Sequence, residues 1–119
     1  MNVLHLTLKK KWFDMIASGE KKEEYREIKE YWKNRLMIAD YVSRNSTTSY
    51  KQHTEFIHFD AVEFKNGYAS NSPAVLIECK GIEVRYGVPD WGAEPWKDYF
   101  VIKLGNILTP NQTLSLDRD

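Results

Sequence analysis

The spacing of apolar and polar residues predicts several short β-strands. Residues 3–8 alternate in the way that is typical of a strand with one buried face. Asn66-Gly67 is a strong turn signal, and Gly81 is the predicted position of a bend. Short apolar runs predict further strands at 56–59, 61–64, 74–84 and 99–104.

Two early segments follow a helical period instead. Apolar residues at positions i, i+3 and i+4 predict an amphipathic helix over 10–18, and Gly19 suits the left-handed position that ends a helix. Residues 30–37 predict a second helix. Several strands with two early helices favour an α+β fold, in which a small mixed β-barrel has two or more short helices packed outside it.

The length of 119 residues predicts one domain over 1–119. Hydrophobic residues are 42% and charged residues 29% of the chain, which is typical of a globular protein and not of a disordered one. The polar residues 43–55 predict a loop or insertion, with a mobile loop over 44–52, and 109–119 read as a polar tail.

Charge and metal-ligand chemistry exclude some classes of protein. With 17 basic and 17 acidic residues, the chain is not expected to coat nucleic acid by bulk charge, although a local basic cleft stays open. Cys79 is the only cysteine, so no disulfide within the chain is possible, and we expect it to be a small buried residue in a strand. The three histidines lack metal-ligand spacing. We therefore expect no metal and no cofactor.

The N-terminal residues lack the basic segment and apolar run of a signal peptide. No stretch approaches the 18 apolar residues of a membrane helix. The expected location is cytoplasmic, without a membrane partner, and the sequence leaves the oligomeric state open.

One charged stretch carries most of the candidate chemistry. Gly19, Lys21, Glu24 and Arg26 form the pattern G-x-K-x-x-E-x-R. On a strand, Glu24 and Arg26 share a face, and Lys21 in the preceding turn can approach the same face. Arginine makes forked contacts with phosphate or a base edge, and lysine acts as a point charge. The pattern predicts one concave site lined by these side chains; a solvated surface charge run is the alternative.

This motif resembles that of the activating signal cointegrator homology (ASCH) family, which carries G-x-K-x-x-E-x-R after its first helix. The segments Leu6-Thr7-Leu8, Trp12-Phe13 and 99–104 are similar to the family as well, so the resemblance spans roughly residues 3 to 108. It implies a PUA-like fold, a small mixed β-barrel with a cleft lined by the motif. It also implies binding of RNA or a nucleotide.

The resemblance implies an alternative activity too. Some bacterial relatives of similar size are amidohydrolases that remove the acetyl group from 4-acetylcytidine, using the motif lysine, a threonine and a downstream glutamate. Here Lys21 is retained, Glu24 stands where those enzymes have threonine, and Glu94 is a candidate for the downstream carboxylate. A hydrolase acting on an acylated nucleoside is thus the second hypothesis, and a protein-interaction domain without a small ligand is the third.

Aromatic and polar loop residues complete the candidate site. Trp91 and Tyr68 offer faces on which a base can stack, and Asn71 and Ser72 offer hydrogen bonds to a base or sugar. Plain turn and loop-anchor roles are the alternatives. Trp12 and Trp32 are predicted to pack in the core because they lie on helices.

Overall fold

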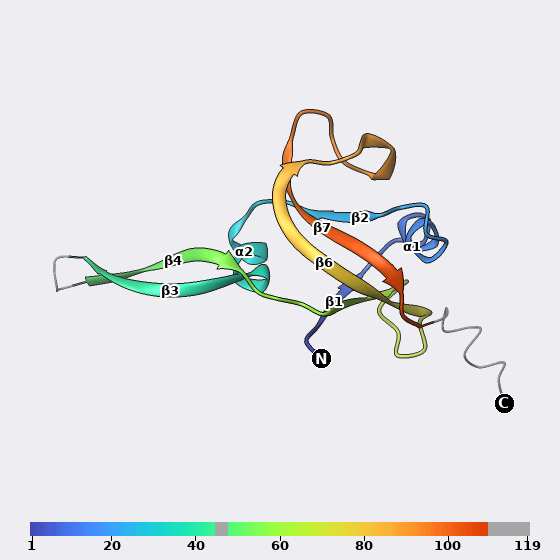
Figure 1. The fold of residues 1–119 in the computed structure, drawn as a ribbon, viewed down its shortest axis with the longest axis horizontal. Helices are drawn as coiled ribbons and strands as arrows, with labels where there is room; N and C mark the ends of the chain where they lie inside the picture. The colour runs from blue at the N-terminus through green and yellow to red at the C-terminus, as the bar shows by residue number, and fades with distance from the viewer. Residues whose placement is uncertain (45–47, 110–119) are drawn as a thin grey trace.

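A computed structural model describes residues 1–44 and 48–109 (Figure 1). The chain is mixed α+β, as predicted, with two α-helices, one short 3₁₀ helix and seven strands among the described residues. In chain order the elements are β1 Val3–Thr7, α1 Lys10–Ala17, β2 Glu23–Arg26, α2 Glu30–Leu36, β3 Met37–Arg44, β4 Thr48–Phe56, β5 Ala61–Lys65, β6 Ala74–Tyr86, η1 Pro89–Trp91 and β7 Asp98–Ile107.

Five strands form one sheet in the order β1-β5-β6-β7-β2. The β1–β5 pair is parallel and the other pairs are antiparallel. The sheet is curled into a half-barrel (Figure 1), so its two edge strands, β1 and β2, turn toward each other.

Both helices contribute side chains to the core on one face of this sheet. Phe13 and Ile16 of α1 and Leu36 of α2 are each 1% exposed or less, and they join the strand residues of the main cluster. A smaller cluster forms around Tyr25, Tyr99, Val101 and Ala93. Among the described residues, no helix is long and apolar enough to cross a membrane.

The end of α1 is built as predicted. Gly19 has φ +85°, and its backbone N–H donates to Ile16 O at 3.0 Å. The N–H of Lys21 then donates to Met15 O at 2.9 Å. These bonds satisfy carbonyls at the helix end and direct the chain straight into β2.

The prediction of a loop over 43–55 is wrong. Residues 37–44 and 48–56 form β3 and β4, a two-stranded antiparallel ribbon that projects from the curled sheet (Figure 1). The mobile loop expected at 44–52 is wrong for the same reason, apart from 45–47, which lie outside the described residues. A projecting ribbon needs no continuous apolar face, so the alternation that marks a half-buried strand is weak in it.

Other strand boundaries differ less. The strand expected at 56–59 is wrong, because Phe56 ends β4 and the next three residues form no strand, although Phe59 is buried. That apolar run reflects burial and not a strand. The bend at Gly81 is confirmed by its φ of +116° and by the register shifts before it. Residues 110–119 of the expected polar tail lie outside the described residues.

A second left-handed glycine follows η1. Gly92 has φ +103°, and a Cβ built on it would lie 3.1 Å from the indole ring of Trp12. At Gly19 the nearest atom to a built Cβ is the flexible Lys22 Nζ, at 3.7 Å. Both glycines therefore have a left-handed backbone conformation, but a side chain has room at position 19 and would press against Trp12 at position 92.

We predict that Gly19→Ala lowers the free energy of unfolding by about 1–2 kcal/mol, the cost of a left-handed non-glycine residue. Gly92→Ala carries the same cost and also pushes against Trp12, so it destabilises more. Urea unfolding of both variants measures the difference. Equal losses at the two positions would contradict the close packing of Gly92 on Trp12.

Candidate functional site

A cleft of about 540 Å³ lies between the two edge strands of the sheet. The end of β1 forms one side, Glu24–Glu27 of β2 and its exit form the other, and Trp12 of α1 and Trp91 of η1 complete the lining. The curl of the sheet therefore places the charged motif at the opening of the half-barrel.

Lys21 does not line this cleft, so the prediction that it lines one concave site together with Glu24 and Arg26 is wrong for the lysine. Its side chain is only 2% exposed and contacts two residues of the cleft lining, Glu24 and Trp91. Its Nζ donates to the backbone oxygens of Glu23 and Trp91, each at 2.8 Å, and lies 2.9 Å from Glu24 Oε1. The ammonium also lies over the ring of Tyr25, 4.7 Å from its centroid. Three acceptors match the three hydrogens of the ammonium group, so the charged form is fully hydrogen-bonded.

Glu24 joins this lysine to the arginine of the motif. Its carboxylate is 8% exposed; Oε1 faces Lys21, and Oε2 accepts a hydrogen bond from Arg26 Nη1. Arg26 also donates to Tyr25 O at 2.8 Å, and its guanidinium lies over the Trp32 ring, 5.0 Å from the centroid. The side chains of the motif form one ionic triad, which we call the Lys21–Glu24–Arg26 triad; Lys21 and Glu24 are buried and Arg26 is partly buried.

Burial and charge act in opposite directions on Lys21. Loss of water contact lowers the pKa of its ammonium below the ordinary value of 10.5, and this exceeds the upward effect of the Glu24 charge and hydrogen bond. Arg26 adds to the lowering because it is a nearby like charge.

The opposite face of β2 carries a second ionic network. Glu23 accepts hydrogen bonds from Arg85 Nη2 at 2.6 Å and from the Tyr25 hydroxyl at 2.6 Å. Tyr25 in turn accepts a hydrogen bond from the backbone N–H of Val88 at 2.8 Å. Burial raises the pKa of Glu23, but the bonds from Arg85 and Tyr25 outweigh it and hold this pKa below the ordinary value of 4.5. The network joins β2 to β6 and to the loop that carries Trp91.

Some candidate residues lie elsewhere. Gly19 and Lys21 line a separate hollow of about 180 Å³. Glu94 does not line the cleft; its side chain is 70% exposed and its carboxylate lies 3.0 Å from Lys97 Nζ. The loop between β5 and β6 is also outside the cleft lining, including Tyr68 (93% exposed), Asn71 and Ser72.

The structure brings in residues that were not among the candidates. Trp12, expected only in the core, is partly buried, packs against the core and lines the cleft. Trp32 likewise packs against the core and lies beneath the Arg26 guanidinium. The apolar spacing along the helix does not indicate that either tryptophan also lies at the cleft or beneath Arg26. The one signal in the sequence is that Trp12 lies shortly after the first strand and close to the charged motif.

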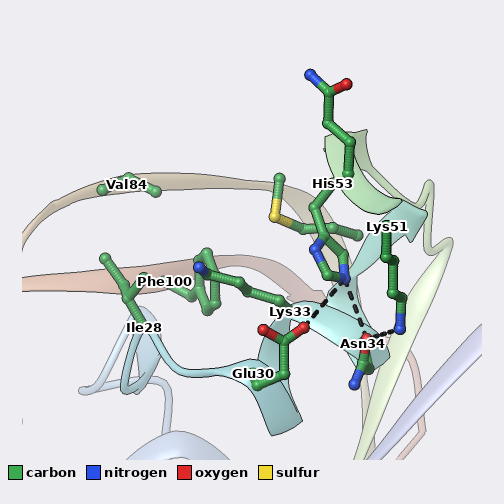
Figure 2. A pocket seen from close by; sticks show the side chains of 10 residues that line it. Ile28, Glu30, Lys33, Asn34, Lys51, His53, Val84 and Phe100 are labelled. Carbon is green, nitrogen blue, oxygen red and sulfur yellow. Dashed lines mark hydrogen bonds and ion pairs between the residues drawn. The ribbon is translucent and has the colours of Figure 1, made fainter. Parts of the chain in front are cut away.

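A larger pocket, of about 840 Å³, lies at the base of the ribbon (Figure 2). It is formed by Ile28, α2, β4 and the sheet strands β6 and β7. None of the motif residues lines it. The described residues contain no group of three or more His, Cys, Asp or Glu side chains placed to hold a metal ion.

Comparisons with family models, with curated proteins and with solved structures find no match to this chain.

The contact between Glu23 and Arg85 predicts that the folded chain loses stability as the pH becomes acidic. The pKa of Glu23 is lower in the folded chain than in the unfolded chain, so its stabilising effect is complete above about pH 4.5 and is lost as the pH falls through the folded value. We expect Glu23→Gln to flatten the fall in melting temperature as the pH decreases below about 4.5. Arg85→Gln removes the main partner and should flatten it as well. Profiles as steep as that of the wild type in both variants would contradict this assignment.

Proposed function

We propose that the chain binds RNA or a nucleotide in the cleft above the Lys21–Glu24–Arg26 triad. The observation that carries this proposal is a buried carboxylate held between two cations beneath an open cleft with tryptophan on its walls. The expected PUA-like fold of the ASCH family belongs to the same proposal. It is supported by the motif and by a curled half-barrel sheet, which is compatible with a small barrel-like fold.

The triad is a poor device for stability alone. Removing Lys21 and Glu24 from water costs several kcal/mol per ion, and well-packed apolar residues often replace such groups without loss. Glu24 and Arg26 line the cleft, where Lys21 helps to hold the Glu24 carboxylate, so they form a polar surface whose donors and acceptors are already oriented. This placement favours a ligand-binding role over a structural one.

The cleft chemistry suits a base and one phosphate. Trp12 and Trp91 supply aromatic surface on which a base can stack. The Glu24 carboxylate can accept from an exocyclic amine, and Arg26 can donate to a base edge or phosphate. Lys9 adds a cation to the lining and Glu27 an anion, so the cleft and its triad hold three cations and two anions. This small excess of positive charge favours one phosphate over a densely charged ligand.

We predict that Arg26→Ala weakens binding of cytidine 5′-monophosphate by about 1–3 kcal/mol, the range for a charge-assisted hydrogen bond. Calorimetric titration at low salt measures the change. Arg35→Ala is the matched control, because Arg35 also lies over the Trp32 ring, at 5.2 Å, but does not line the cleft. Equal affinities for the wild type and Arg26→Ala would remove Arg26 from the site, and absence of binding by the wild type would remove the proposal.

A second candidate function is hydrolysis of an acylated nucleoside. The specific observation in its favour is the lowered pKa of the buried Lys21 ammonium, since a desolvated lysine can act as a base. Two observations oppose it. Lys21 Nζ already has three acceptors, and the exposed Glu94 is paired with Lys97 outside the cleft lining.

We predict that the wild type does not turn over 4-acetylcytidine, because both carboxylates of the cleft lining are paired with cations and Glu24 replaces the hydroxyl of the hydrolase pattern. Glu24 pairs with Lys21 and Arg26, and Glu27 pairs with Lys97. Chromatographic detection of cytidine after prolonged incubation tests this. If turnover appears, Lys21→Arg decides its mechanism, since arginine keeps the charge and does not deprotonate near neutral pH. Activity that survives Lys21→Arg would exclude lysine base chemistry.

A further inference from the structure

The pocket at the base of the ribbon has the size and lining of a ligand site. Its volume of about 840 Å³ lies within the range of small-molecule pockets. Ile28, Val84 and Phe100 give it an apolar wall (Figure 2), and Val84 and Ile28 are 49% and 39% exposed. An apolar surface of this kind on a curled sheet is available for contact with a ligand.

Two lysines, Lys33 and Lys51, line the same pocket. Lys33 extends from α2 into the pocket, with its ammonium end toward Ile28 and Phe100 (Figure 2), and no carboxylate of the described residues lies within ion-pair distance of it. Lys51 donates to Asn34 Oδ1 on another side of the pocket. Glu30 is the one acidic residue of the lining. The excess of positive charge is complementary to an anionic group such as a phosphate.

Two exposed aromatic rings continue the same surface. Tyr86 follows Val84 by two residues on β6, so the two side chains share a face. The Trp96 ring packs edge-on against the Tyr86 ring, and the two ring centroids are 5.8 Å apart. Trp96 is 84% exposed and Tyr86 is 52% exposed. Trp96 also has φ +61°, a costly conformation for a bulky residue. The fold thus holds a tryptophan in water at the cost of backbone strain.

The register of the sheet links this surface to the cleft. Arg26 of β2 lies opposite Phe100 of β7, and Phe100 lies opposite Val84 of β6. Residues directly opposite in neighbouring strands share a face. Arg26 therefore lines the cleft on the same sheet face that forms the wall of the pocket.

We infer that the ligand is single-stranded RNA of several nucleotides and not a free nucleotide; this inference rests on the proposed function. One base occupies the tryptophan-lined cleft, and the strand passes Arg26 into the pocket. There Lys33 contacts a phosphate, and Tyr86 and Trp96 provide a stacking platform for a further base. Aromatic rings beside cations are the combination by which proteins hold unstacked single strands.

The test compares two probes, cytidine 5′-monophosphate and a six-nucleotide single-stranded RNA, by equilibrium titration at several salt concentrations. We expect the wild type to bind the RNA more tightly. Trp96→Ala should weaken RNA binding about fivefold or more, the lower end of the loss of one stacked base. Lys33→Gln should reduce the slope of log affinity against log salt by about 0.7, the value for one phosphate contact on a single strand. Neither change should alter binding of the mononucleotide.

Matched controls separate these effects from general loss of aromatic or charged surface. Tyr68→Ala removes a ring that is 93% exposed, and Lys80→Gln removes an exposed lysine of β6; neither residue lines the pocket or the cleft. Both controls should bind the RNA as the wild type does. Thermal unfolding monitored by circular dichroism establishes that each variant is folded.

The outcomes distinguish the two proposals. Mononucleotide binding with no tighter binding of RNA, or with an RNA affinity unchanged by Trp96→Ala and Lys33→Gln, overturns the extended site and leaves the cleft proposal standing. Binding of neither probe by the wild type overturns both. Loss of RNA binding in the two controls as well as in the variants would also overturn the assignment to this surface.

Discussion

The buried ammonium of Lys21 is the interaction on which the site depends. Its hydrogen bonds connect the turn after α1 with the start of β2, which follows directly in the sequence, and with the carbonyl of Trp91 in the distant β6–β7 connection. Because a buried charge is tolerated only when it is fully partnered, each of these segments is held in one position by the others. Glu24 extends this order outward to Arg26, and through it to Trp32 of α2. The positions of the residues that line the cleft are therefore fixed by a cluster of polar contacts and not by the apolar core alone.

The curl of the sheet gives this cluster its setting. A flat sheet would leave β1 and β2 at opposite edges, and the charged strand would lie on an open surface. The half-barrel turns these edges toward each other, so side chains of both edges and Trp12 of α1 line one cleft. The outer face of β2 is fixed separately by Glu23, Arg85 and Tyr25. Both faces of this four-residue strand are therefore partnered, which explains why a strand so rich in charge is buried.

The sequence predicted the parts of the fold that local chemistry controls. Alternation and helical spacing located β1, α1 and α2, and the absence of a Cβ placed Gly19 at the helix end and Gly81 at the bend. The same rules failed on residues 43, 44 and 48–55, which were expected in a loop and belong to the ribbon of β3 and β4. Its strands pair with each other in a separate two-stranded sheet, so the curled five-stranded sheet does not impose its alternating pattern on them. They also failed to show that Trp12 both packs in the core and lines the cleft. The apolar spacing of a helix indicates only which of its faces is buried, not which residues on that face also border a cleft.

For the candidate site, the sequence by itself determined that Glu24 and Arg26 lie on one face and that Lys21 lies in the turn beside them. This follows from the two-residue repeat of a strand. Only the tertiary structure decided that the lysine is buried, that Trp91 supplies one of its acceptors, and that Glu94 and Tyr68 stand outside the cleft lining. These contacts join residues up to 70 positions apart. Local spacing cannot specify them, because they depend on the curl of the sheet and on the path of the β6–β7 connection over its outer face.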